Sequence, residues 1–131
     1  MDATTGAKPS VPGKPYTGVI IDATGYKIDR AMSPHIRKAD GSEVWGTVTA
    51  DFDLVLDRGI VSYATSLDDA KKLARVGSNP MIIRAIGRSG GKFYCDPVIS
   101  DGDAELLLYE NGKSKFLNNS AVVFVKDKRT Y

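Results

Sequence analysis

The sequence predicts an α+β fold: a single domain with a mixed β-sheet, two or three helices and a β-hairpin. Apolar, β-branched runs recur along the chain and are typical of buried strands. An Asp-Gly pair lies between two extended runs, and two serines each precede apolar residues at helical spacing. The helices are few and lie late in the chain, which disfavours a regular βαβ repeat.

The composition is that of one globular domain. Of 131 residues, 42% are hydrophobic and 26% are charged, which excludes disordered and fibrous proteins. Eighteen Lys and Arg against sixteen Asp and Glu leave a formal charge of +2, whereas a dedicated nucleic-acid binder normally carries a strong basic excess. No apolar run approaches the length of about 20 residues that spans a bilayer. We therefore expect neither a nucleic-acid partner nor a membrane span in this chain.

The chain holds one cysteine, Cys95, and one histidine, His35. A lone cysteine cannot form an internal disulfide, and a lone histidine cannot supply a multi-histidine metal site. His35 follows Ser33-Pro34, without the strained Gly-x-Ser-x-Gly turn that presents a hydrolase nucleophile. Cys95 has only Lys92 near it to lower its pKa, so we expect a half-buried, ordinary thiol. No cofactor, no metal and no catalytic residue are expected.

Residues 1–15 predict a flexible linker or a mature N-terminus. They hold three prolines and two glycines without apolar periodicity, so they cannot form a core. They also lack the apolar region of a signal peptide. Either an export signal or an upstream domain precedes Asp2, or the chain is a cytosolic protein with a floppy tail. The folded domain is expected over 16–127, and a charged tail over 128–131.

The first part of the domain predicts a strand and a hairpin. Residues 16–23 are β-branched and nearly continuously apolar at their centre, as in a strand buried on both faces. Residues 35–38 and 43–49 flank Ala39-Asp40-Gly41-Ser42. Asp-Gly between two extended runs is a strong hairpin signal, because glycine accepts a positive φ without cost.

The middle of the chain predicts two helices. Residues 51–59 have apolar side chains at helical spacing and predict a short helix, followed by an extended segment over 60–63. Ser66 and Asp69 then form the reciprocal pair that caps a second helix. Gly77 is well placed to end it.

Residues 81–86 predict the next strand. Its expected core residues are Ile82, Ile83 and Ile86. A loop is expected over 87–91, and a return strand over 93–99 that Pro97 interrupts.

The motif Gly-Arg-Ser-Gly-Gly-Lys at 87–92 predicts a turn rather than a phosphate-binding loop. Such a loop needs a glycine five positions before its Gly-Lys pair and a Ser or Thr directly after it. Here Ile86 stands at the glycine position and Phe93 follows Lys92.

The last part predicts a helix and a strand. Ser100 and Asp103 repeat the cap in front of helically spaced leucines, and Asn111-Gly112 closes that helix. Phe116-Leu117 predicts one more helical turn, and 121–125 the final buried strand. The acidic clusters in the helical first turns fit capping better than a calcium loop.

Asp22 is the most suggestive polar residue. It ends a strongly apolar strand, and binding groups gather at strand ends in open sheets. The alternative is that Asp22 caps the turn at Thr24-Gly25. The candidate binding residues are Asp22, Ser33, Arg37, Trp45 and Arg84.

Several segments are familiar in their order. They are 16–23 (Tyr-Thr-Gly-Val-Ile-Ile-Asp-Ala), 32–37 (Met-Ser-Pro-His-Ile-Arg), 40–46 (Asp-Gly-Ser-Glu-Val-Trp-Gly), 74–85, 96–101, 116–117 and 122–125. Together they resemble a module of exported bacterial envelope proteins, the LPP-20 lipoprotein and flagellar-assembly-T-like group. The resemblance covers 16–127. His35 departs from it, because the relatives have Arg there, and this puts a chemical role for the histidine in doubt.

The resemblance implies a setting rather than a chemistry. In that group the module usually ends a longer exported chain, after a signal peptide, a small α+β domain and a Pro-rich linker. It implies an extracytoplasmic domain, periplasmic or associated with the outer membrane, from which the signal peptide has been removed. The group brings no catalytic residues, so none is carried over.

We therefore expect a non-enzymatic binding or assembly module of the bacterial envelope, whose partners are envelope proteins of the flagellum, the outer membrane or another surface structure. The 33–48 hairpin and the Asp22 strand end are the expected contact region, because a hairpin edge can bind an added strand. The alternative is a domain that binds a small ligand or metal through Asp22 with Arg37 or Arg84. A hydrolase ranks third. Partner identity, oligomeric state and an upstream lipid anchor stay open.

Overall fold

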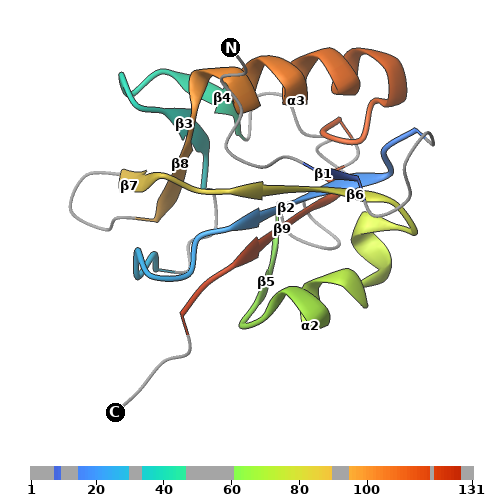
Figure 1. Cartoon of the computed structure of the whole chain (residues 1–131), viewed down its shortest axis with the longest axis horizontal. Coiled ribbons are helices and arrows are strands. Elements are labelled where there is room, and N and C mark those ends of the chain that lie inside the picture. The colour runs from blue at the N-terminus through green and yellow to red at the C-terminus, as the bar shows by residue number, and fades with distance from the viewer. Residues whose placement is uncertain are drawn as a thin grey trace.

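The computed structural model describes residues 8–9, 15–29, 34–46, 61–89, 95–118 and 120–127. The elements in these residues are β1 (Lys8–Pro9), β2 (Gly18–Asp22), β3 (Ile36–Lys38), β4 (Glu43–Trp45), β5 (Ser62–Ala64), α2 (Leu67–Lys71), the 3₁₀ helix η2 (Ala74–Val76), β6 (Pro80–Arg84), β7 (Gly87–Ser89), β8 (Asp96–Ile99), α3 (Asp101–Ser114) and β9 (Val122–Val125). They confirm the predicted α+β class (Figure 1). The helix predicted at 51–59 lies outside the described residues.

The first sheet has the strand order β1-β6-β2-β9-β5. β6, β2, β9 and β5 are mutually parallel, and β1 joins β6 in the antiparallel sense. β2 lies between its neighbours with Val19 opposite both Met81 and Val122. Lys8–Pro9, inside the segment predicted as a linker, therefore forms a short edge strand, a position that tolerates proline.

The second sheet has the order β4-β3-β8-β7. β3 and β4 form the predicted antiparallel hairpin, β8 runs parallel to β3, and β7 pairs with β8 in the antiparallel sense. Both sheets are thus mixed, and the strands divide between two sheets where the sequence indicated one. At Ala85-Ile86 the chain passes from β6 in the first sheet to β7 in the second.

The two faces of the first sheet bury separate apolar clusters. Along β2, Val19 and Ile21 face one cluster and Ile20 faces the other, as the alternation of a strand requires. α3 adds Leu107 to the first cluster, and α2 adds Ala70 to the second. Figure 1 shows α3 and α2 on opposite sides of this sheet, which gives three layers.

Both predicted helix caps are confirmed. The Asp69 N–H donates to Ser66 Oγ, and the Asp103 N–H donates to Ser100 Oγ, each over 3.1 Å. α2 ends at Lys71 and the chain continues in η2 as far as Gly77. α3 runs past Asn111-Gly112 to Ser114 and ends on Lys115, which is left-handed with φ 59°.

Three local predictions are wrong. Ile86 is 40% exposed, because Met81, Ile83 and Ala85 are the residues of this segment that face the first cluster. Gly87–Ser89 is strand β7 rather than loop, since it pairs with β8. β8 also runs straight through Pro97.

The stretch after α3 also differs from its prediction. Phe116 and Leu117 lie in a turn rather than in a further helical turn. Both side chains are buried in the first cluster. The turn thus closes the core between α3 and β9.

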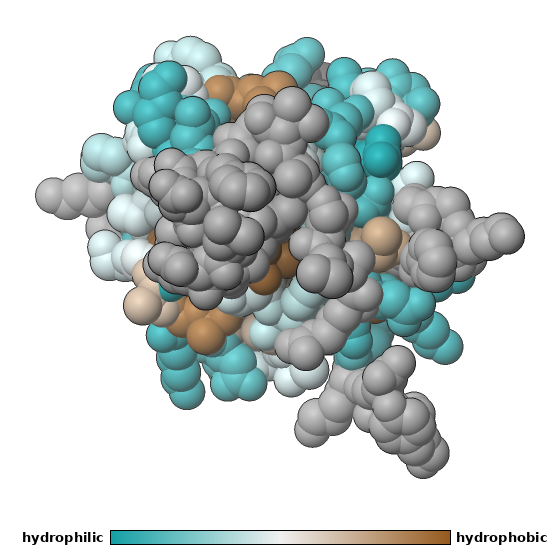
Figure 2. Space-filling view, turned by 180° about the vertical axis from the view of Figure 1, so that it is seen from behind, coloured by the Kyte–Doolittle hydropathy of each residue, from teal (hydrophilic) through white to brown (hydrophobic). Residues whose placement is uncertain are grey.

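On the face drawn in Figure 2, the described residues are mainly hydrophilic. Figure 2 shows teal residues around most of the outline, with brown residues in separate patches. The large exposed hydrophobic residues in the described ranges are Ile86, Leu108 and Tyr109. No helix in these ranges has the length and apolarity needed to cross a membrane.

Candidate functional site

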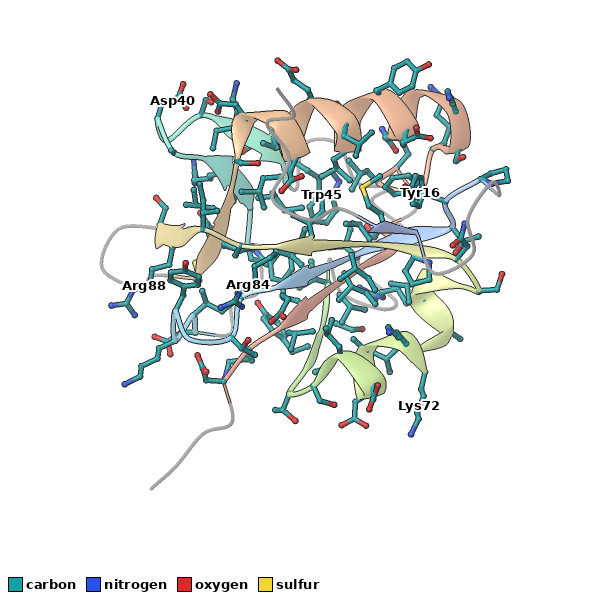
Figure 3. The ribbon with its side chains drawn as sticks, viewed as in Figure 1. Tyr16, Asp40, Trp45, Lys72, Arg84 and Arg88 are labelled. Carbon is teal, nitrogen blue, oxygen red and sulfur yellow. The ribbon has the colours of Figure 1, made fainter. Side chains whose placement is uncertain are left out.

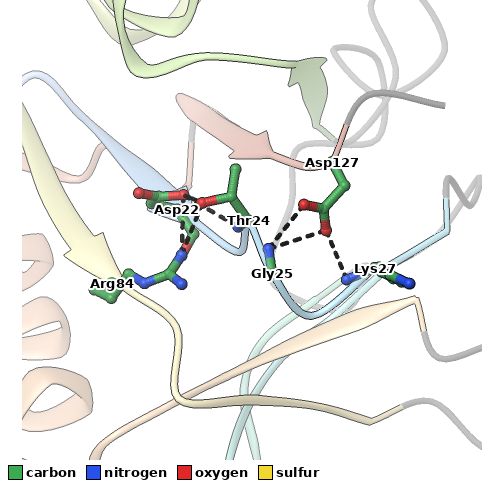
Figure 4. A network of polar contacts seen from close by, with 6 residues as sticks. All are labelled: Asp22, Thr24, Gly25, Lys27, Arg84 and Asp127. Carbon is green, nitrogen blue, oxygen red and sulfur yellow. Dashed lines mark hydrogen bonds and ion pairs between the residues drawn. The ribbon is translucent and has the colours of Figure 1, made fainter. Parts of the chain in front are cut away.

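The carboxyl ends of the parallel strands meet at one edge of the first sheet, as they must in a parallel arrangement. Asp22 is the last residue of β2, and Arg84 is the last residue of β6 and its register partner. Asp127 lies two residues beyond the end of β9. We call this group, with the loop at 24–27, the carboxyl edge (Figure 4).

Asp22 caps the turn that follows β2. Its Oδ1 accepts hydrogen bonds from the Thr24 N–H at 3.1 Å and from the Thr24 hydroxyl at 2.7 Å. Arg84 Nη1 donates to the same Oδ1 at 3.2 Å and to the Asp22 carbonyl at 3.1 Å. Asp22 and Arg84 are thus brought together as predicted, and the structure shows the capping role for Asp22 that the sequence offered as the alternative.

Asp127 holds the same loop from the other side. Its carboxylate accepts the Gly25 N–H at 2.8 and 3.0 Å and the Lys27 N–H at 2.8 Å. Gly25 and Lys27 both have positive φ, 93° and 55°, and so direct their N–H groups toward one point. The backbone N–H of Gly25 is the main cause that lowers the pKa of Asp127.

Two arginines lie along the outside of the carboxyl edge (Figure 3). The Arg84 guanidinium carbon lies 5.4 Å from the centre of the Tyr26 ring, a cation–π distance. The Arg84 side chain remains 44% exposed. Arg88 Nη1 donates to the Lys27 carbonyl at 3.2 Å. Both arginines therefore fasten the loop while they present positive charge to solvent.

Arg37 lies in the second sheet and takes no part in the carboxyl edge. Its Nε donates to Asp96 Oδ2 at 2.7 Å, and its Nη1 donates to the Gly41 carbonyl at 3.0 Å. Asp96, whose side chain is 3% exposed, also accepts the His35 N–H at 2.8 Å. Asp96 thus ties β8 to β3, and Arg37 pairs with Asp96 rather than with Asp22.

Trp45 is a core residue rather than a surface contact. It is 1% exposed, and its Nε1–H donates to the Leu117 carbonyl at 3.1 Å. The strand alternation turns this side chain inward from β4, so it is not part of the exposed surface of the hairpin. Ser33 lies outside the described residues.

The residues around the hairpin base pair with one another. His35 Nδ1 contacts Glu43 Oε1 across the hairpin. Cys95 is a half-buried free thiol, as predicted. Burial, then the neighbouring Asp96 charge, raises the pKa of Cys95, so its thiol stays protonated at neutral pH.

The carboxyl edge can recognise charge and hydrogen-bonding groups. Across the described ranges, no three His, Cys, Asp or Glu side chains are grouped so as to hold a metal ion. Sequence reasoning missed Asp127 and Asp96, whose roles depend on contacts 102 and 59 residues away in the chain. The sequence signal for Asp127 was its position just after an apolar strand, which is where residues at the carboxyl edge of the sheet lie.

Comparison with known proteins identifies a family. Residues 18–128 match the model of the family described as Treponema pallidum Tp0624, second domain. No curated protein matches the chain. The match covers every described element except the edge strand β1, from the start of β2 to just beyond β9. The chain therefore belongs to the family of the Treponema pallidum Tp0624 second domain.

Proposed function

We propose that this chain is a non-enzymatic binding or assembly module of the bacterial cell envelope. Two observations support the setting. The segments quoted above resemble exported envelope proteins of the LPP-20 and flagellar-assembly-T-like group. The family is described after the second domain of a protein from a bacterium, so in that protein the unit is one part of a larger chain.

The position of the hairpin carries the proposal. β4 is the terminal strand of the second sheet in the order of the described strands. The turn residues 39–42 are all exposed, and Asp40 lies at an outer corner of the molecule (Figure 3). A terminal strand presents backbone N–H and C=O groups that can pair with an extended segment of a partner. Strand addition to β4 is the proposed mode of binding.

The core holds this edge rigidly. Trp45 anchors β4 through its buried indole and its hydrogen bond to Leu117. Glu43, at the other end of β4, is exposed and contacts His35 on the paired side of the hairpin. A pre-formed edge binds with a smaller loss of conformational entropy than a segment that orders on binding.

A pair of substitutions at Glu43 tests strand addition. The Lys38 N–H donates to the Ser42 carbonyl at 2.9 Å, so the backbone groups of Ser42 point toward β3. Glu43 is the next residue of the strand, and its backbone groups therefore point away from β3. Glu43→Pro removes that outward N–H, and Glu43→Ala removes the same carboxylate but keeps the N–H. The tagged variants are used to capture partners from the envelope fraction of the source bacterium, with mass spectrometry as the readout.

We expect the native chain and Glu43→Ala to recover the same envelope proteins, and Glu43→Pro to lose them. Circular dichroism confirms that each variant is folded. Recovery of the same proteins by a folded Glu43→Pro variant would exclude strand addition to β4. The identity of the recovered proteins decides between a flagellar and an outer-membrane role.

Localisation is tested separately by fractionating cells that express the complete gene. The proposal places the protein in the periplasm or with the outer membrane. Recovery in the cytosolic fraction, together with a cytosolic marker enzyme, contradicts the envelope setting.

The small-ligand alternative depends mainly on Asp22, whose described contacts are with residues of the same chain. Asp22 Oδ1 already accepts three hydrogen bonds, from Thr24 and Arg84, and its carboxylate is balanced by the Arg84 guanidinium. A metal ion or ligand that takes Asp22 Oδ1 would have to displace these donors. The structure thus favours a structural role for Asp22 over a ligand-binding one.

A further inference from the structure

The loop at 24–27 has the backbone geometry of an anion site. Gly25 and Lys27 both have positive φ, and their N–H groups converge on the Asp127 carboxylate. Successive N–H groups in such a conformation form a concavity that binds anions in many phosphate sites. Here the anion is a side chain of the same chain.

Positive side chains surround this concavity. Lys126 Nζ donates to the Asp127 carbonyl at 3.1 Å, and Lys27 is the loop residue whose own N–H binds the Asp127 carboxylate. A Cβ on Gly25 would meet Arg84 Nη2 at 3.5 Å, and Arg88 Nη1 donates to the Lys27 carbonyl.

Fewer carboxylates than positive side chains lie near the loop among the described residues. Among the described residues of the loop and of the strand ends beside it, the carboxylates besides Asp127 are Asp22, which Arg84 engages, and Asp29, which is exposed. Without Asp127, this described set carries more positive than negative charge.

The Asp127 carboxylate is not part of the backbone ladder of the sheet. The Lys126 N–H donates to the Ala64 carbonyl at 2.9 Å, so the backbone ladder holds the chain up to Lys126 and Asp127 follows it. The bonds from Asp127 to the loop are solvent-exposed. An exposed internal ligand of this kind is displaced at lower cost than a buried one.

We propose that the loop at 24–27 is a binding site for a compact oxyanion, a carboxylate or phosphate group, and that Asp127 occupies it as an internal ligand. An incoming anion takes the Gly25 and Lys27 N–H groups in exchange for Asp127. The site belongs to the first sheet and is independent of the proposed partner strand at β4.

Asp127→Ala tests the proposal with inorganic phosphate and acetate as probes. The readout is the amide shifts of Gly25 and Lys27 in ¹⁵N–¹H NMR spectra, titrated at constant ionic strength against chloride. We expect saturable shifts at both amides, with phosphate or acetate bound about ten-fold more tightly by Asp127→Ala than by the native chain. Preference between the two probes identifies the anion.

Asp29→Ala is the matched control, because it removes an exposed carboxylate next to the same loop and leaves Asp127 in place. It should behave like the native chain. Equal shifts in Asp29→Ala and Asp127→Ala, or no saturable shift in either, overturn the proposal. If Asp127→Ala does not fold, Asp127→Asn replaces it: the variant loses the charge, and its amide oxygen competes more weakly than the carboxylate for the two N–H groups, so anion binding should still be tighter than in Asp29→Ala.

Discussion

Ser120 combines two features that oppose stability. It is fully buried in the turn before β9, and it is left-handed with φ 54°. Its hydroxyl has no hydrogen-bond partner in the structure described. A left-handed non-glycine residue costs about 1–2 kcal/mol, and a buried unpaired hydroxyl adds to that cost.

Ser120→Gly should therefore stabilise the protein. We expect a gain of about 0.5–1 kcal/mol in the free energy of unfolding, after the larger entropy of glycine in the unfolded chain is subtracted. Urea denaturation measures it. Ser120→Ala, which removes the hydroxyl but keeps the left-handed strain, should gain less. A destabilised Ser120→Gly variant would contradict this account.

Trp45→Phe should destabilise the protein by about 2–3 kcal/mol. The substitution removes the indole donor to the Leu117 carbonyl, which then keeps only the hydrogen bond from the Ser120 N–H, and it creates a small cavity in the core. Urea denaturation again gives the free energy of unfolding. A loss below about 0.5 kcal/mol would show that Trp45 is not the core anchor of β4.

Asp127 makes the stability of the loop depend on pH. Its pKa is lowered in the folded protein, so the carboxylate contributes stability at pH values above about 4, the range of an unperturbed aspartate. This contribution is lost as the pH falls through the lowered pKa. The stability difference between the native chain and Asp127→Asn should be constant from about pH 5 to 7 and shrink below about pH 4. A difference that grows on acidification would contradict this assignment.

At the scale of elements, Asp96 links β8 to β3, two strands that lie far apart in the sequence. Its carboxylate accepts the His35 N–H and Arg37 Nε, which fixes β3 beside β8. Asp96→Ala leaves the partly exposed Arg37 with only its bond to the Gly41 carbonyl, removes the acceptor of the His35 N–H, and should cost about 2–3 kcal/mol of unfolding free energy. Asp96→Asn keeps one acceptor oxygen and should cost less. Equal stability of Asp96→Ala and the native chain, by urea denaturation, would contradict this role.

Elements with a local signal could be predicted from the sequence. The Asp40-Gly41 hairpin and the caps at Ser66 and Ser100 depend on residues within a few positions of one another. β7 had no such signal: Gly87–Ser89 reads as a turn, and its strand conformation comes from pairing with β8. Ile86 was misplaced for the same reason, because it lies where the chain passes between sheets.

At the scale of the whole molecule, the division into two sheets decided which candidate residues meet. Arg37 and Arg84 are both arginines near strand ends, yet they lie in different sheets and only Arg84 reaches Asp22. Single-sequence patterns specify faces of strands, not the sheet to which a strand belongs. Asp22 could be recognised from its place after an apolar strand, and its local contact with Thr24 was a predicted alternative. The choice of Arg84 over Arg37 as its partner followed only from the parallel register of β2 and β6.

If β4 receives a partner strand, its backbone amides should be better protected from exchange in the complex than in the free chain. Hydrogen exchange of the tagged chain, alone and in the captured complex, measures which backbone amides become protected. We predict slower exchange in β4 on binding and unchanged exchange in α2, which packs on the other sheet. Unchanged exchange in β4, or protection centred on α2, would contradict the central claim.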